Sequence, residues 1–311
     1  MIKIYRQHYY WYELESISRF IDCEYVNDMA SCDFIEVASS EPKPVFDHIE
    51  KPIIYSYVRE HPYTHDEHLQ IQFDSLKDHH DITIFSLGSF EKFAPGRNNV
   101  IIDQFELDAY HRLFVRNECG TASGSIGYLN YLFLGGKADK LNRKPLYDLL
   151  EKYNLQHKGL RTLFGETASP DNAEYIGDHY LGYPYDVGLY KTHNLSLIAE
   201  THYEHNQEFH PTEKTYRAIA NSHPFIIAST PYFLHNLKQK GYQTFSNFWS
   251  ENYDFQLNHT QRLQEIVESL QQALDVKYAD IEKICAHNVA TLKKNSLNTR
   301  KNIITSLYEQ L

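Results

Sequence analysis

Carboxylates, hydroxyls and cations gather in residues 195–232 of the sequence. An apolar run from Leu195 to Ala199 predicts a strand, and it stops at a carboxylate, Glu200. A polar loop and a short helical pattern follow, and a second apolar run from Phe225 to Ala228 predicts another strand. This order predicts a βαβ unit. In α/β proteins, ligands bind where the strands of such units end.

The helix of this unit is predicted to begin at Pro-Thr-Glu-Lys, residues 211–214. Thr212 suits the N-cap position, and Glu213 and Lys214 fall in the first turn. The unpaired amides and the dipole of a helix N-terminus attract phosphate. Lys214 adds a cation, while Glu200 and Glu213 can accept hydrogen bonds from sugar hydroxyls. The chemistry indicated is the binding of a ligand that carries both phosphate and hydroxyl groups.

A second group of cations follows another predicted strand, Tyr128 to Leu134. The loop after this strand contains Lys137, Lys140, Arg143 and Lys144. Pro145 suits the first turn of a helix that starts there. Because this loop also lies at a strand end, its cations are expected to help neutralise a diphosphate. The alternatives are a surface helix charge for Arg143 and a helix-capping carboxylate for Glu213.

Glu60 follows a strand predicted at residues 51–58, in the first half of the chain. Placed across a cleft from the phosphate site, its carboxylate could act as the general base that deprotonates an acceptor hydroxyl. The alternative is an exposed loop glutamate. His61, His65 and His68 lie nearby, but their spacing matches no standard metal-binding motif, so no metal is expected.

The elements that must position these residues alternate between strand and helix patterns. In the first half, strands are expected at Ile2–Tyr5, Asp33–Ala38, Lys51–Val58 and Ile82–Leu87. A second such series begins at Tyr128, and apolar stripes predict helices from about Thr260 onward. Alternation of this kind is typical of an α/β fold with mostly parallel sheets. We expect two βα domains that face a cleft, followed by a helical C-terminal segment.

The segment from Gly120 to Gly127 is rich in glycine and serine. It lacks the Lys-Ser/Thr ending of a phosphate-binding loop, so it is interpreted as a linker. The predicted domains are therefore 1–120, 121–260 and 261–311.

Composition and charge limit the classes of function. The chain has 311 residues, of which 42% are hydrophobic and 23% charged, which is typical of a globular protein. A formal net charge of −11 argues against broad binding to nucleic acid or to an anionic membrane. The four cysteines show no metal-type pair spacing, and neither a signal peptide nor a transmembrane-length apolar stretch is evident. We expect a reduced, cytoplasmic protein without a membrane span.

The run from Ala199-Glu200 through Thr212-Glu213-Lys214 and Arg217 to Pro224-Phe-Ile-Ile resembles the donor-site signature of GT-B glycosyltransferases, most closely the α1,3-fucosyltransferase family. That signature has a strand ending in glutamate, a short loop, Thr-Glu-Lys, a helix and another strand. Arg59-Glu60-His61-Pro62 looks like the Glu-Ser-Pro segment of the same family. Two departures are His202, where the family has serine, and Ser-His-Pro before the second strand.

The resemblance covers this region well and the rest of the chain only in architecture. Through Gly241–Phe245 and Glu251–Asp254 the sequence is also similar to uncharacterised phage and bacterial glycosyltransferase-like proteins. The implied fold is GT-B, which consists of two Rossmann-like domains with C-terminal helices packing across them.

The implied activity is that of an inverting, metal-independent glycosyltransferase, of hexosyl- or fucosyltransferase type. It would move a sugar from a GDP- or UDP-linked donor to a hydroxyl of a surface polysaccharide or lipopolysaccharide, with no further cofactor. Glu60 would be the catalytic base. The residues implied in donor binding are Arg143, Glu200, Thr212, Glu213, Lys214 and Arg217, with Lys137, Lys140, His61 and His202 as accessory residues.

Two alternatives remain open at the level of the sequence. One is a phage-type glycosyltransferase that modifies DNA bases, which the acidic balance of the chain disfavours. The other is a non-catalytic module that binds a nucleotide sugar or a glycan.

Overall fold

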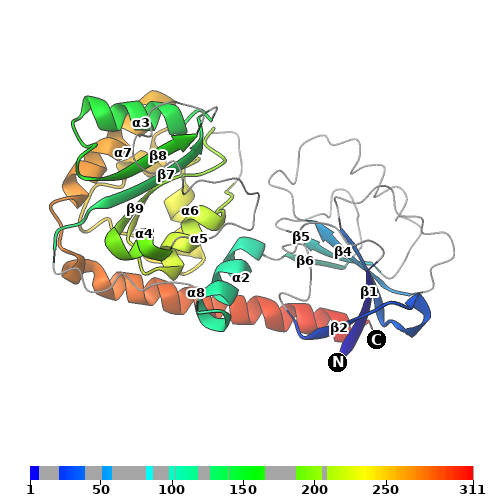
Figure 1. Cartoon of the computed structure of the whole chain (residues 1–311). Helices are drawn as coiled ribbons and strands as arrows, with labels where there is room; N and C mark the ends of the chain where they lie inside the picture. The colour runs from blue at the N-terminus through cyan, green and yellow to red at the C-terminus, as the bar shows by residue number, and fades with distance from the viewer. Residues whose placement is uncertain are drawn as a thin grey trace. The chain divides into compact units, whose positions relative to one another are not determined.

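The structure is a computed structural model of the whole chain. It describes residues 1–6, 21–38, 51–57, 82–86, 98–101, 103–117, 127–138, 140–164, 187–204 and 209–310. The chain forms two compact units (Figure 1). One consists of Met1–Asp108 together with Asn295–Leu311, and the other of Ala109–Lys294.

A six-stranded sheet forms the first unit, in the order β2-β1-β3-β4-β5-β6 with every neighbouring pair parallel. The strands are β1 (Ile2–Arg6), β2 (Cys23–Val26), β3 (Phe34–Ala38), β4 (Ile53–Tyr57), β5 (Ile82–Ser86) and β6 (Asn98–Ile101). A short 3-10 helix, Met29–Ser31, lies between β2 and β3. The four strands predicted in this half are confirmed. Strand β2 was not predicted, because an edge strand that carries Glu24 lacks a clear apolar pattern.

The core of the first unit joins the sheet to a helix that follows it in sequence and to the last helix of the chain. Ile4 of β1 and Phe34 of β3 are fully buried against Leu107 of α2 (Gln104–Tyr110). The same core contains Ile303 and Leu307 of α8 (Tyr278–Tyr308), and α8 contributes its residues from Asn295 onward to this unit. The sheet of the N-terminal residues is therefore completed by C-terminal ones.

The second unit is built on a four-stranded parallel sheet in the order β10-β9-β7-β8. Its strands are β7 (Tyr131–Lys137), β8 (Gly159–Phe164), β9 (Leu195–Ala199) and β10 (Phe225–Ala228). Every residue of β9 and β10 is buried, which explains why β10 is a continuous apolar run and why β9 is apolar except for Ser196.

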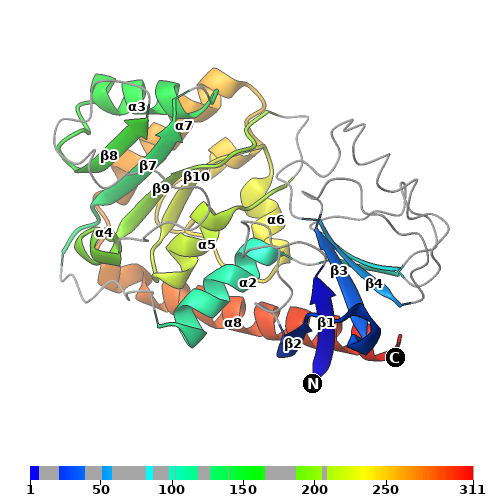
Figure 2. The ribbon, with the colours of Figure 1, turned by 45° about the vertical axis from the view of Figure 1, so that its right-hand side comes forward.

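Helices cover both faces of this sheet. They are α3 (Arg143–Lys152), α4 (Val187–Thr192), α5 (Glu213–Ala220), α6 (Phe233–Gln239) and α7 (His259–Ala273). Figure 2 shows α3 and α5 on opposite sides of the sheet. Helix α3 packs on β7 and β8, while α5 packs on β9 and β10. The α/β class, the parallel sheets and the helical C-terminal region are confirmed.

Some predictions lie outside what the structure describes. The linker predicted at residues 120–127 is among them, except for Gly127. The domain limits at 120 and 260, and the cleft between two facing domains, stay predictions. Helix α4 was not predicted, because it lies at the end of a glycine- and tyrosine-rich stretch without helical periodicity. Among the described helices, none combines the length and the apolar character needed to cross a membrane.

Candidate functional site

The order of the strands defines where a ligand would bind in the second unit. From β7 the chain passes through α3 to β8 on one side, and from β9 it passes through α5 to β10 on the other. Because β7 and β9 are neighbours, the connections that leave their carboxyl ends diverge to opposite faces of the sheet. Open parallel sheets bind ligands at this topological switch point.

Glu200, the residue after β9, is fully buried and anchors the start of α5. Its Oε1 accepts hydrogen bonds from the backbone amide of Thr212 at 3.0 Å and from the hydroxyl of Thr215 at 2.6 Å. Its Oε2 accepts from the hydroxyl of Thr212 at 2.5 Å. The carboxylate therefore joins the end of a strand to the first turn of the following helix.

Thr212 is the N-cap of α5, as predicted. Its hydroxyl oxygen accepts from the backbone amide of Lys214 at 3.4 Å and from the Nζ of the same residue at 3.2 Å. The two following side chains, Glu213 and Lys214, form an ion pair at 2.9 Å and keep 18% and 22% of their side-chain surface exposed. The ammonium group is thus held in the first turn of α5, on a side chain that is not fully buried.

Electrostatics keeps this ion pair charged. Burial alone would raise the pKa of Glu213, but Lys214 and Arg217 outweigh it and lower that pKa to about 2. Burial acts to lower the pKa of Lys214, but the carboxylates of Glu213 and Glu200 outweigh it and raise the pKa. The positive charge of Arg143 acts on Lys214 in the opposite direction. The two cations are therefore close enough to influence one another.

Arg143 begins α3 and is buried. Its guanidinium packs against Gly136, whose φ of +68° suits glycine. A Cβ at Gly136 would lie 3.1 Å from Nη1 of Arg143. The pairing of β7 with β8 shifts register between Leu134 and Lys137, so the strand is irregular at this glycine. The irregular strand end and the missing side chain make room for the guanidinium.

Asn142 connects the loop after β7 to the ends of β9 and β10. Its role was not predicted from the sequence. The side chain is fully buried, and Nδ2 donates to the carbonyls of Glu200 at 2.9 Å and of Ala228 at 3.0 Å. An asparagine just before a helix usually caps it. Here the side chain makes no cap bond and instead crosses to β9 and β10. The only sequence signal was a short polar residue ahead of a predicted helix.

The predicted accessory residues and the neighbouring Lys144 lie on different elements of the second unit. His202 is buried, and its ring lies 4.9 Å from that of His210 in the loop that leads to α5. The backbone oxygen of Lys140 accepts from the amide of Arg143 at 3.2 Å. Lys137 ends β7. Lys144 pairs with Asp148 on the exposed face of α3, which is the geometry of a surface helix charge.

Arg262 of α7 is a second residue that the sequence did not reveal. It is buried, its Nη1 donates to the carbonyl of Ser229 at 2.7 Å, and its guanidinium lies 4.3 Å from the ring of Tyr203. The hydroxyl of Ser229 donates to the carbonyl of His202 at 3.0 Å. Arg262 therefore holds together the segments that follow β9 and β10. The sequence placed Arg262 only within the helical region predicted from about Thr260 onward.

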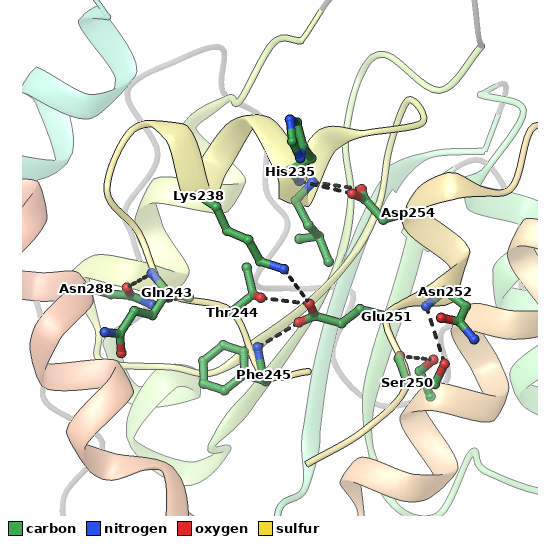
Figure 3. A network of polar contacts seen from close by, with 12 residues as sticks. His235, Lys238, Gln243, Thr244, Phe245, Ser250, Glu251, Asn252, Asp254 and Asn288 are labelled. Atoms are coloured by element: carbon green, nitrogen blue, oxygen red, sulfur yellow. Dashed lines mark hydrogen bonds and ion pairs between the residues drawn. The ribbon is translucent and has the colours of Figure 1, made fainter. Parts of the chain in front are cut away.

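The Glu251–Asp254 segment has a structural role, shown in Figure 3. Glu251 accepts from the hydroxyl of Thr244 and the amide of Phe245, both at 2.7 Å, and pairs with Lys238 at 3.3 Å. Asp254 accepts from the amides of Leu234 and His235 at the start of α6. Nearby, Asn288 of α8 pairs with the backbone of Gln243 through both of its side-chain polar atoms. This network fixes the chain that follows β10.

The second unit thus brings together, at one edge of its sheet, the predicted donor-binding residues Arg143, Glu200, Thr212, Glu213, Lys214 and Arg217. Glu60 and His61 lie outside the described residues, so their roles stay predictions. Within the described ranges, no group of three or more His, Cys, Asp or Glu side chains is arranged to hold a metal ion.

No model of a known protein family matches the chain, and no curated protein matches it in sequence. Solved structures of α1,3-fucosyltransferase align with it. One shares 13% identity with a TM-score of 0.33 and covers 94% of this chain and 80% of that one. A complex with GDP-fucose shares 12% identity with a TM-score of 0.32, covering 94% and 90%. A complex with GDP shares 12% identity with a TM-score of 0.33, and the alignment covers 94% of this chain and 90% of that one. Fold likeness alone does not define function, so function is argued from the site.

Proposed function

We propose that this protein is a glycosyltransferase that moves a sugar from a nucleotide-sugar donor to a hydroxyl acceptor, such as a surface polysaccharide or lipopolysaccharide. The observation that carries the proposal is the position of Lys214 and Arg143. They lie at the N-terminus of α5 and beside the end of β7, at the switch point of a parallel sheet. A helix N-terminus with two cations is suited to a diphosphate.

The local charge supports an anionic ligand. Among the predicted donor-binding residues at this edge, three are cations, Arg143, Lys214 and Arg217, and two are carboxylates, Glu200 and Glu213. Three minus two leaves a formal charge of +1, to which the dipole of α5 adds further positive potential. The chain as a whole carries −11. A positive edge on an acidic protein favours a small anion over a polyanion such as DNA.

The residues divide the work of transfer as follows. The acceptor oxygen forms a bond to the anomeric carbon of the donor sugar, while the bond from that carbon to the diphosphate breaks. The configuration of the anomeric carbon is thereby inverted. The leaving nucleoside diphosphate takes the electron pair, and Arg143 and Lys214 offset its charge. Glu60 accepts the proton of the acceptor hydroxyl. Glu213 accepts hydrogen bonds from the donor sugar or ribose.

Glu200 contributes indirectly to this scheme. Because three protein donors already bind its carboxylate, its main effect is to hold Thr212 and the first turn of α5 in place. We therefore assign Glu200 and Asn142 to positioning. The residues that contact the donor are Arg143, Glu213, Lys214 and Arg217.

Thermal unfolding in the presence of GDP, UDP and their common sugar conjugates tests the proposal. At least one of them should raise the Tm, and Lys214→Ala should remove the rise. Lys144→Ala is the matched control, since Lys144 lies next to Arg143 but pairs with Asp148 on the exposed helix face. If no nucleotide or nucleotide sugar shifts the Tm of the unchanged protein, the proposal fails.

A further inference from the structure

Two aromatic side chains in the second unit are largely exposed and lie against each other. The ring centroids of Tyr232 and Phe255 are 5.6 Å apart, and the ring planes meet at 76°, an edge-to-face arrangement. Tyr232 is 47% exposed and Phe255 56% exposed. The pair fixes the orientation of both rings while leaving much of their surface to solvent.

The backbone at Tyr232 is unusual for so large a residue. Its φ is +64°, in the left-handed region. The other non-glycine residues with positive φ in the described chain are Asn117, Asn154 and Ser222, which are small and polar. Tyr232 is held in place because its amide donates to the carbonyl of Asp254 at 2.6 Å. A strained backbone that displays a half-exposed ring points to a role outside the core.

This pair lies at the same sheet edge as the phosphate site. Tyr232 follows shortly after Ala228, the last residue of β10. The next residue, Phe233, packs its ring 5.0 Å from that of Phe209. Phe209 in turn lies three residues before Thr212, the N-cap of α5. The loop that leads into the phosphate-binding helix therefore packs directly on the residue beside Tyr232.

We propose that the Tyr232–Phe255 pair is the stacking surface for the nucleobase of the bound donor. This inference rests on the proposed function, because it places the nucleobase on the Tyr232–Phe255 pair and the diphosphate of the same nucleotide at the N-terminus of α5. A base presents a flat apolar face, and stacking on an exposed aromatic ring suits any base. The pair contributes the contact that a free diphosphate cannot make.

The test compares the affinities of GDP and UDP with that of inorganic pyrophosphate, measured by calorimetry on purified variants. Tyr232→Gly removes the ring and also relieves the positive φ, so it should not harm folding. Phe255→Ala removes the other ring. Each should weaken binding of the better nucleotide about tenfold or more and leave the affinity for pyrophosphate unchanged. Tyr232→Phe should bind like the unchanged protein, since it keeps the ring.

Leu257→Ala is the matched control, because Leu257 is equally exposed at 58% and close in sequence but not aromatic. It should leave all affinities unchanged. Nucleotide binding that is lost in Lys214→Ala but unaffected by both Tyr232→Gly and Phe255→Ala overturns this inference and leaves the proposed function standing. Absence of nucleotide binding to the unchanged protein overturns both.

Discussion

The hydroxyl of Thr212 donates to Oε2 of Glu200 at 2.5 Å, and the backbone amide of Thr212 donates to Oε1 of the same carboxylate at 3.0 Å. One residue at the end of β9 thus holds the N-cap of α5 through two of its groups. Because Lys214 lies in the first turn that this N-cap fixes, the position of the cation depends on a buried contact behind it.

We predict that Glu200→Ala strongly destabilises the second unit. The substitution leaves three buried donors, from Thr212 and Thr215, without their acceptor, at a cost of about 3 kcal/mol or more. Glu200→Gln keeps one carbonyl acceptor and should cost clearly less. Urea unfolding of both variants measures the difference. A loss below about 1 kcal/mol in Glu200→Ala would show that the carboxylate does not anchor the helix.

Gly136→Ala should lower both stability and nucleotide affinity. The positive φ disfavours alanine by about 1 kcal/mol, and the new Cβ would push against the guanidinium of Arg143. Gly127→Ala is the control, because a Cβ at Gly127 meets nothing within 4 Å. Unfolding midpoints and nucleotide titrations of the two variants should separate them. Equal behaviour would mean that Gly136 does not make room for Arg143.

His223 should make the protein less stable in acid. Its Nε2 lies 2.7 Å from the carbonyl of Tyr190, to which it must donate, so Nδ1 accepts from the hydroxyl of Ser196 at 3.0 Å. Burial lowers the pKa of this imidazole to about 4, against an ordinary value of 6.5.

Between these pKa values the unfolded chain binds the proton and the folded chain does not. The free energy of unfolding should therefore fall as the pH drops from about 6.5 to about 4, by about 3 kcal/mol in total at 1.36 kcal/mol per pKa unit. Denaturant unfolding at several pH values measures this slope. His223→Gln should flatten it over the same range, and an unchanged slope in that variant would assign the acid sensitivity to other groups.

Glu213→Gln should tighten the binding of a nucleoside diphosphate while impairing sugar transfer. The substitution removes the negative charge that pairs with Lys214, so the ammonium group, which also donates to the hydroxyl oxygen of Thr212, becomes more available to phosphate. We expect about a fivefold gain in affinity, or about 1 kcal/mol, that shrinks as salt is added. Titration of GDP and UDP at two salt concentrations checks this. Weaker binding in the variant would mean that the carboxylate of Glu213 binds the ribose of the nucleotide rather than the donor sugar.

Glu60→Gln should slow transfer strongly without changing donor binding. Loss of a general base lowers the rate by about a hundredfold to ten-thousandfold. Glu24→Gln, an exposed glutamate on β2, serves as the control in the same unit. Release of nucleoside diphosphate from the donor, with and without an acceptor, measures turnover. If Glu60→Gln keeps full turnover, the base lies elsewhere, and if the unchanged protein binds donors without any turnover, it is a binding module.

Local patterns in the sequence were sufficient to predict the strands and the helix N-terminus that form the site. The fully buried strands β9 and β10 are apolar except for Ser196, and Thr212, followed by an acidic and a basic residue, marks the start of α5. These signals come from neighbouring residues, so they can be read without knowing the fold.

The contacts that shape the site depend on residues far apart in the chain. Asn142 donates to the carbonyl of Ala228, 86 residues away, and Arg262 donates to that of Ser229, 33 residues away. No local pattern encodes such pairs. The room for Arg143 likewise depends on a strand irregularity at Gly136, which a glycine in sequence does not distinguish from an ordinary turn.

Helix α8 also affects when the first unit can fold. Ile303 and Leu307 complete the core that contains Ile4 and Phe34. The strands of this sheet are synthesised first, but their core can be completed only after α8, the last element of the unit, has been synthesised. The ribosome would hold an open, apolar sheet until then, a state in which chaperones are recruited and aggregation begins.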